Sequence, residues 1–136
     1  MKKEINVSAV YTKDGDKVFL SQRPADKHQG GKWEFFGGKL EINETYEEAA
    51  VREAKEELNF DIKVEDLEYF DEIKYEYENF ILNMKLFEAT KWEGVPEKLE
   101  VVDFAWIDVN NIDGLDVVDA DVELLEKLKN NILNRH

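Results

Sequence analysis

Three glutamates near the middle of the chain have a spacing that suits metal chemistry. Glu53, Glu56 and Glu57 stand at positions i, i+3 and i+4, which places three carboxylates on one face of a helix. Like charges at this spacing destabilise an isolated helix, so something must offset their repulsion. A divalent cation such as Mg²⁺ would do so, because it prefers oxygen ligands and accepts a phosphate in its shell. The alternative is a solvated acidic face on a surface helix.

The residues around these glutamates favour the cation site over the plain acidic surface. Gly37 and Gly38 come shortly before the helix, and glycines let backbone groups approach a ligand closely. Arg52 precedes Glu53 and can orient one of the carboxylates through charge-assisted hydrogen bonds. Lys39 follows the glycines, where its ammonium group can meet a phosphate. The segment therefore predicts a site for a cation and a phosphate together.

Local patterns predict the helix that must position these groups. A Thr-x-x-Glu capping box at residues 45–48 indicates a helix N-terminus. The helix is expected to end near Leu58, and Asn59 suits a left-handed C-cap. Val51, Ala54 and Leu58 fall on the face opposite the glutamates, so we expect that face to pack on a sheet.

The rest of the chain predicts strands and a second helix. Apolar runs bounded by turn residues predict strands at 4–12, 18–24, 33–36, 61–74, 78–90 and 101–107. A polar loop is expected at 25–32. Apolar residues at helical spacing predict a helix over 121–133. The mixture predicts an α/β fold, but periodicity does not tell which face of the sheet each helix covers.

Composition limits the classes of protein that the chain can be. Its 136 residues suit one domain, 1–136. The absence of cysteine excludes a disulfide framework, thiolate metal sites and a cysteine nucleophile. A net charge of −14 argues against nucleic-acid polymers and anionic membranes as partners. The N-terminus lacks a signal-like apolar run, so we expect a cytoplasmic protein, either a monomer or a homodimer.

The segment GKLEINETYEEAAVREAKEELNF, residues 38–60, resembles the box of the Nudix hydrolase family, G-x5-E-x7-R-E-U-x-E-E-x-G-U, with U an apolar residue. The matching positions are Gly38, Glu44, Arg52-Glu53, Ala54, Glu56-Glu57 and Phe60. Asn59 replaces the usual glycine, and asparagine tolerates the same backbone conformation. Ala54 is small for its position, and Phe36 stands where many relatives have proline; neither change removes a ligand.

The resemblance extends to the MutT-like branch over nearly the whole chain. QRPADKH, KWEF, KWEG and DADVELLEKL fall where that branch has similar segments. It implies an α/β fold of the Nudix type, an α/β/α sandwich with a mixed sheet. It also implies hydrolysis of a nucleoside triphosphate to a monophosphate and pyrophosphate. The implied cofactor is Mg²⁺, with Mn²⁺ as an alternative, and water would attack the β-phosphorus.

The resemblance assigns the metal ligands by position. The carboxylates of Glu53, Glu56 and Glu57 would bind the metal, together with the Gly37 carbonyl. Glu100, six residues before a tryptophan as in that branch, would be a fourth acidic ligand or the base. Glu53 could also be the base, and the choice stays open.

Positioning and substrate residues also follow from the resemblance. Glu44 would steady the loop and helix, and Arg52 would orient a catalytic glutamate. Arg23 matches an arginine that contacts phosphate or nucleotide; its alternative is an ordinary surface arginine. Phe35 would line the base pocket or pack in the core. Asp121 would read the base or cap the last helix.

Four functions remain open at this point. The first is a MutT-like enzyme that removes an oxidised purine nucleotide such as 8-oxo-dGTP, and the second is the same chemistry on CTP or a modified dCTP. The third is another Nudix branch acting on ADP-ribose, NADH or dinucleoside polyphosphates. Tyr75 and Tyr77 lie roughly where the last of these has a tyrosine, and the array typical of the NADH branch is absent. The fourth is a ligand sensor that has lost catalysis, which the complete set of box glutamates argues against.

Overall fold

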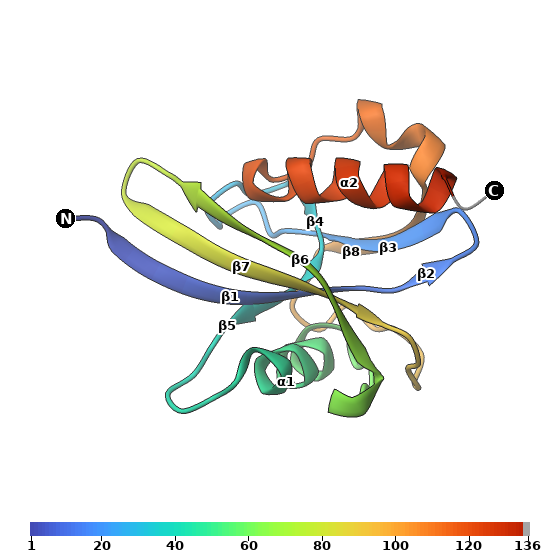
Figure 1. The fold of residues 1–136 in the computed structure, drawn as a ribbon, viewed down its shortest axis with the longest axis horizontal. Coiled ribbons are helices and arrows are strands. Elements are labelled where there is room, and N and C mark those ends of the chain that lie inside the picture. Colours follow the sequence, from blue (N-terminus) through green and yellow to red (C-terminus); the bar gives the residue numbers. More distant parts are fainter. Residues whose placement is uncertain (135–136) are drawn as a thin grey trace.

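The two helices lie on opposite sides of the strands in a computed structural model that describes residues 1–134 (Figure 1). The α-helices are α1 (Tyr46–Leu58) and α2 (Val122–Leu133). The strands are β1 (Lys3–Tyr11), β2 (Lys13–Asp14), β3 (Lys17–Gln22), β4 (Trp33–Glu34), β5 (Phe36–Lys39), β6 (Leu67–Glu76), β7 (Phe80–Ala89) and β8 (Asp103–Asp108). Short 3₁₀-helices are η1 (Val64–Asp66), η2 (Val109–Gly114) and η3 (Asp119–Asp121). No helix in this part of the chain is long and apolar enough to cross a membrane.

The strands form two four-stranded sheets. The first has the order β5-β1-β7-β6, in which β1 and β7 run parallel and the other pairs are antiparallel. In the second, β3 pairs with β2, β4 and β8, all antiparallel. Because β4 and β5 belong to different sheets, the run predicted as one strand at 33–36 is divided. The chain passes from one sheet to the other at Phe35, which puts residues 34–37 where the two sheets meet.

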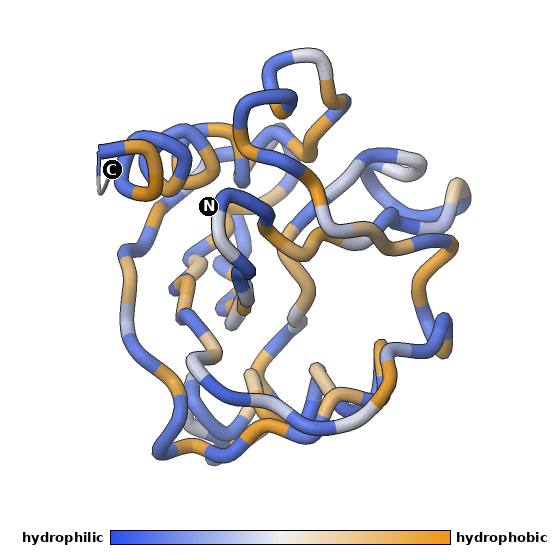
Figure 2. The backbone as a smooth tube through the Cα atoms, turned by 90° about the vertical axis from the view of Figure 1, so that its right-hand side faces the viewer, coloured by the Kyte–Doolittle hydropathy of each residue, from blue (hydrophilic) through white to orange (hydrophobic). Residues whose placement is uncertain are grey.

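Side chains alternate between two apolar clusters, one beneath each helix. Figure 2 shows hydrophobic and hydrophilic residues alternating along much of the chain. Val10 and Phe36 belong to the cluster that includes Leu58 of α1. Their neighbours Tyr11 and Phe35 belong to the cluster beneath α2. Period-2 alternation in a strand produces this division, and it decides which cluster each residue of the site faces.

Helix α1 forms as its sequence predicts. Thr45 Oγ1 accepts a hydrogen bond from the Glu48 amide at 3.0 Å, and Glu48 Oε1 accepts one from the Thr45 amide at 2.9 Å. This reciprocal pair satisfies two amides at the helix start. Asn59 has φ 60° and ends the helix in the left-handed conformation. Ala54 and Leu58 are fully buried, which confirms the predicted packing face.

Two predicted boundaries are wrong. The strand predicted at 61–74 begins only at Leu67, because η1 occupies 64–66 and Asp61 makes only an isolated bridge to Glu93. Gly37 and Gly38, which follow the strand predicted to end at residue 36, are part of β5 and pair with β1. Strand pairing at these two glycines brings the backbones of β5 and β1 close together.

Candidate active site

Strand β5 and helix α1 approach each other at two glycines. A Cβ atom at Gly38 would collide with the carboxylate of Glu53, and one at Gly37 would collide with the carbonyl oxygen of Ser8. Gly37 also has φ 145°, a conformation that side chains disfavour. Gly38 therefore lets Glu53 lie directly against the strand, and Gly37 lets β5 lie close to β1.

Three carboxylates meet beside this contact. Glu53, Glu56 and Glu100 each place an oxygen within 4.8 Å of the others. Glu100 lies far along the chain, and its amide donates to the Glu57 carbonyl at 3.2 Å, as does that of Leu99 at 3.1 Å. Carbonyls in the last turn of a helix lack helical partners, so α1 itself fixes the segment that carries Glu100. The structure thus brings Glu100, which only the resemblance assigned to the metal, next to two glutamates that helical spacing had already suggested.

The side chain of Glu57 is turned inward, away from the face of α1 that Glu53 and Glu56 share. It is only 8% exposed and lies beside Glu34 and Glu53. Burial, and then these two carboxylates, raise the pKa of Glu57 to about 9, while a hydrogen bond from the Gly37 backbone opposes the rise. The single face predicted for the three glutamates is therefore divided: Glu56 is exposed and Glu57 is buried. A cation among these groups would relieve their repulsion.

Arg52 connects the loop before α1 with the carboxylate cluster. Its Nε and Nη2 donate to the two carboxylate oxygens of Glu44 at 2.7 and 2.9 Å. Its Nη1 donates to Glu53 at 2.6 Å and to Glu56 at 3.1 Å, and Nη2 also reaches the Lys39 carbonyl at 2.9 Å. The paired hydrogen bonds from Arg52 lower the pKa of Glu44 to about 2. The contact that the sequence predicted between Arg52 and Glu53 is present.

A cavity of about 360 Å³ lies on the other side of β5, toward α2. It is lined by all four residues predicted to bind substrate: Arg23, Phe35, Lys39 and Asp121. Asp121 is 4% exposed, and its Oδ2 accepts a hydrogen bond from the Phe35 amide at 3.0 Å. Its side chain makes no capping hydrogen bond to α2, so the helix-cap alternative is wrong. Burial raises the pKa of Asp121 well above its ordinary value.

Glu34 is a site residue that the sequence analysis did not find. Arg23 Nη1 donates to Glu34 at 3.1 Å, and Arg23 Nε donates to the His28 carbonyl at 2.9 Å. Burial raises the pKa of Glu34 to about 7, and the Arg23 guanidinium opposes the rise. The sequence feature that points to Glu34 is its position as a single acidic residue inside the apolar run Trp33-Glu34-Phe35-Phe36.

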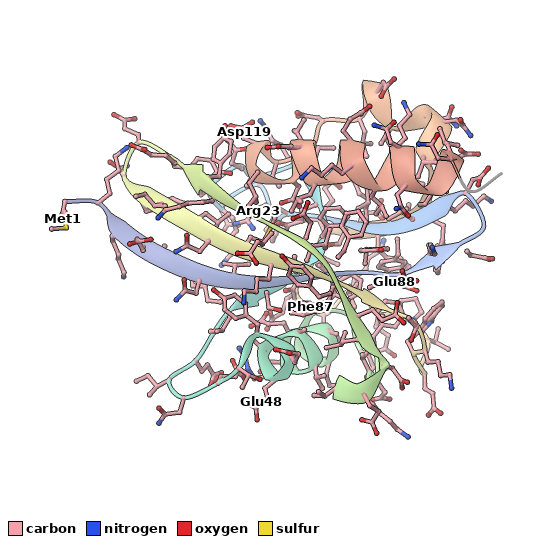
Figure 3. All side chains as sticks on the ribbon, viewed as in Figure 1. Met1, Arg23, Glu48, Phe87, Glu88 and Asp119 are labelled. Atoms are coloured by element: carbon pink, nitrogen blue, oxygen red, sulfur yellow. The ribbon has the colours of Figure 1, made fainter. Side chains whose placement is uncertain are left out.

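Arg23 and Glu34 join the two halves of the site. A second cavity, of about 470 Å³, adjoins the first and is lined by Glu57 and Glu100. Both cavities share Arg23, Glu34 and Gly37. Arg23, labelled in Figure 3, projects from the end of β3. A ligand in the 360 Å³ cavity can therefore extend past Arg23 to Glu57 and Glu100.

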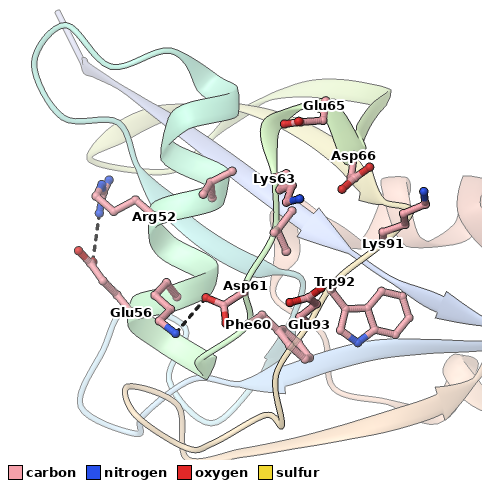
Figure 4. A pocket seen from close by; sticks show the side chains of 13 residues that line it. Arg52, Glu56, Phe60, Asp61, Lys63, Glu65, Asp66, Lys91, Trp92 and Glu93 are labelled. Atoms are coloured by element: carbon pink, nitrogen blue, oxygen red, sulfur yellow. Dashed lines mark hydrogen bonds and ion pairs between the residues drawn. The ribbon is translucent and has the colours of Figure 1, made fainter.

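A larger and more open groove, of about 1020 Å³, lies along the outer side of α1 (Figure 4). Trp92 and Lys63 line it, and Arg52 and Glu56 stand at its edge. It contains no other residue predicted for the site. Lining acids such as Asp61 are mixed with lysines, so the groove has no charge of one sign to select a ligand. We place the active site in the two smaller cavities.

The fold and the glutamate cluster against a glycine strand define a hydrolase of the Nudix type, and the comparisons agree. The family model described as NUDIX domain matches residues 7–127, so the chain belongs to the Nudix family. It is 30% identical over 129 residues to the 8-oxo-dGTP diphosphatase of Escherichia coli strain K12, covering 95% of this chain and 98% of that protein. It is 33% identical over 120 residues to the CTP pyrophosphohydrolase of the same organism, covering 88% and 87%.

A solved structure agrees with the fold. The solution structure of the E. coli ORF135 protein superimposes with a TM-score of 0.84 at 30% identity, covering 98% of this chain and 94% of that one. The predicted fold class, an α/β/α sandwich with a mixed sheet, is confirmed.

Proposed function

We propose that this protein hydrolyses a nucleoside triphosphate to a nucleoside monophosphate and pyrophosphate with the help of Mg²⁺. One observation carries the proposal: a cavity lined by Glu57 and by Glu100 of the carboxylate cluster adjoins, at Arg23, a second cavity that is lined by the buried carboxyl of Asp121. The cluster suits a cation with its phosphates, and the cavity suits a base. The relatives named above support hydrolysis of nucleotides.

The donor set fits a hard divalent cation. It consists of oxygen atoms: three carboxylates lie within 4.8 Å of one another, and a fourth is buried beside them and next to the Gly37 backbone. Mg²⁺ prefers such oxygen ligands and keeps positions free for phosphate and water. We assign the ligands to Glu53, Glu56, Glu57 and Glu100, with the Gly37 carbonyl. When bound, the cation neutralises phosphate charge and lowers the pKa of a bound water.

The protein's own groups then orient the reaction. The oxygen of water attacks the β-phosphorus. The bond from that phosphorus to the oxygen that bridges it to the α-phosphorus breaks, and the nucleoside monophosphate leaves with that oxygen. A carboxylate takes the proton of the water; Glu53 and Glu100 are the candidates, since both lie in the cluster. Arg52 keeps the Glu53 carboxylate in one orientation, and the pair of hydrogen bonds to Glu44 keeps Arg52 in place.

Arg23 and Lys39 supply the positive charge for the phosphates. Both line the 360 Å³ cavity, and Arg23 also lines the one that holds Glu57 and Glu100. In a chain with a net charge of −14, such cations and the metal are what lets a polyphosphate approach. Asp121 lies at the base end, where an oxygen of its carboxyl group accepts a hydrogen bond from an N–H group in either protonation state.

An oxidised purine nucleotide of the 8-oxo-dGTP type is our first candidate substrate, in line with the E. coli diphosphatase. CTP or a modified dCTP is the second, because the CTP pyrophosphohydrolase matches at 33% identity. Asp121 accepts hydrogen bonds from cytosine and from guanine-type bases alike.

A nucleotide screen tests the proposal. The protein is incubated with Mg²⁺ and each of 8-oxo-dGTP, dGTP, CTP, 5-methyl-dCTP, UTP, ADP-ribose and diadenosine tetraphosphate. We expect pyrophosphate from the first four. Reaction in ¹⁸O-water should place the label in pyrophosphate. Release of orthophosphate with a nucleoside diphosphate, or turnover of ADP-ribose alone, would contradict the proposal.

A further inference from the structure

Three aromatic side chains lie together at the rim of the 360 Å³ cavity. Tyr77 and Phe80 stack with ring centroids 4.9 Å apart and planes 29° from parallel. The His28 ring stands edge-on to both, with centroids 4.7 Å from Tyr77 and 5.4 Å from Phe80. All three line the cavity. They come from two separate parts of the chain: His28 from the 25–32 loop, and Tyr77 and Phe80 from the turn between β6 and β7 and the first position of β7.

Packing of the core does not account for these rings. Neither of the two apolar clusters includes Tyr77, Phe80 or His28, even among the partly buried residues packed against them. Tyr77 and Phe80 are half-buried and His28 is exposed. Flat rings that stay partly open beside a cavity are suited to a flat ligand, because offset stacking on an aromatic face adds to the free energy of burial.

Tyr77 also connects this aromatic group to the segment that carries Asp121. Its hydroxyl oxygen accepts a hydrogen bond from the Ala120 amide at 3.2 Å. Burial raises the pKa of Tyr77 to about 12, so the hydroxyl is neutral at pH 7. This hydrogen bond holds the turn between β6 and β7 against η3. Its donor, Ala120, immediately precedes Asp121, the residue proposed to face the base.

We propose that the turn between β6 and β7, together with the first residue of β7, is a base-recognition wall, in which Phe80 stacks on the nucleobase, Tyr77 packs behind the Phe80 ring, and the Tyr77 hydroxyl positions Asp121. This inference rests on the proposed function and adds residues to it. Stacking attracts any base, because every base has a π-face. Asp121 selects by hydrogen bonding, because a buried polar group left unpaired is costly. Affinity and selectivity therefore come from different residues.

Binding of the products tests the wall without catalysis. Dissociation constants are measured by calorimetry for 8-oxo-dGMP and CMP, and for pyrophosphate with Mg²⁺. Phe80→Leu keeps an apolar side chain and removes the ring. It should weaken binding of the better-bound monophosphate roughly 5- to 100-fold, the scale of one base–aromatic stack. Pyrophosphate, which has no base, should bind as it does to the unaltered protein.

Tyr69→Leu is the matched control. Tyr69 lies on β6, is 54% exposed and packs against Phe87 away from the cavity. It should leave both affinities within about twofold. Circular dichroism of each variant at 25 °C establishes that it is folded. Equal weakening by Phe80→Leu and Tyr69→Leu, an unchanged affinity in Phe80→Leu, or an equal loss for pyrophosphate would overturn the wall.

Tyr77→Phe separates the two roles, since it keeps the ring and removes the hydroxyl. Monophosphate affinity should stay within about threefold, while the preference in kcat/KM for the best base over the worst falls several-fold. An unchanged preference would overturn the positioning role. Failure of the proposed function has a different signature: a protein that binds monophosphates through Phe80 and hydrolyses no triphosphate. Hydrolysis that is indifferent to Phe80 contradicts only the wall.

Discussion

The two halves of the site contain acidic residues in contrasting surroundings. On the α1 side, Glu44, Glu53 and Glu56 share the guanidinium of Arg52 in a network that is partly open to solvent. Toward α2, Glu34 is half-buried and Asp121 is buried, and the cation that acts on both is Arg23. The pKa of Glu44 is lowered, whereas those of Glu34 and Asp121 are raised.

This difference fits the roles proposed for the two halves. Ionised, oriented carboxylates are what a cation site needs, and an arginine within the same helix provides them at little cost. Carboxyl groups that are buried with few cations hold their protons more strongly and discriminate between hydrogen-bonding partners. Glu57 stands between the two halves, buried beside Glu34 but joined to Glu53. Variants on each side should therefore fail in different ways.

We expect the largest loss of turnover from a substitution at Glu57, where the two halves of the site meet. Glu57→Gln keeps the size of the side chain and removes its charge, so turnover should fall by roughly 10²- to 10⁴-fold while the protein stays folded. Pyrophosphate release with Mg²⁺ measures turnover, and circular dichroism measures folding. Glu47→Gln, an exposed change on the same helix, should be neutral. Near-normal turnover in folded Glu57→Gln would remove Glu57 from the metal site.

Arg52→Lys tests the open half alone. Lysine keeps the charge but loses the paired hydrogen bonds to Glu44, so Glu53 is no longer held in one orientation. We expect kcat to fall about 10- to 100-fold, with KM changed little. Steady-state kinetics with varied nucleotide at saturating Mg²⁺ separates the two constants. A rise in KM with unchanged kcat would show that Arg52 serves binding and not orientation.

Asp121→Ala tests the buried half. The fall in kcat/KM for the best substrate should correspond to a loss of roughly 1–3 kcal/mol in transition-state binding, which is the usual scale for an unpaired buried group. Poor substrates should lose much less, because they never used the contact. A panel of triphosphates measured under identical conditions gives the comparison. An equal loss on every triphosphate would mean that the base is read elsewhere.

The smallest expected effect is a change in the pH dependence of stability when the carboxyl group of Glu34 is replaced. Its pKa is near 4.5 in the unfolded chain and about 7 in the fold, so between these values the folded protein binds more protons. Stability therefore falls as pH rises through this window. In metal-free protein, Glu34→Gln should reduce the drop in Tm between pH 5 and pH 8 by on the order of 5 °C. Thermal melts in EDTA measure it; identical pH slopes in the two proteins would contradict the assignment.

Local sequence predicted α1 and its open half of the site. The capping box, the Asn59 cap, the buried face at Ala54 and the contact from Arg52 to Glu53 are all present. Each depends on residues within one or two helical turns of each other, so helical geometry alone relates them. The two glycines were recognised as a place of close approach, although they lie in a strand and not in a loop.

Only the tertiary structure decided the buried half. Glu34 faces Asp121 and Glu57 because the chain changes sheets at Phe35, and Glu100 reaches the cluster through the last carbonyls of α1. Asp121 faces Phe35 and does not cap α2. Such contacts join segments tens of residues apart, and their geometry depends on how sheets and helices pack. Burial, which raises the pKa of a carboxyl, is likewise a property of the folded chain, since the same residue in an isolated segment would stay hydrated and ionised.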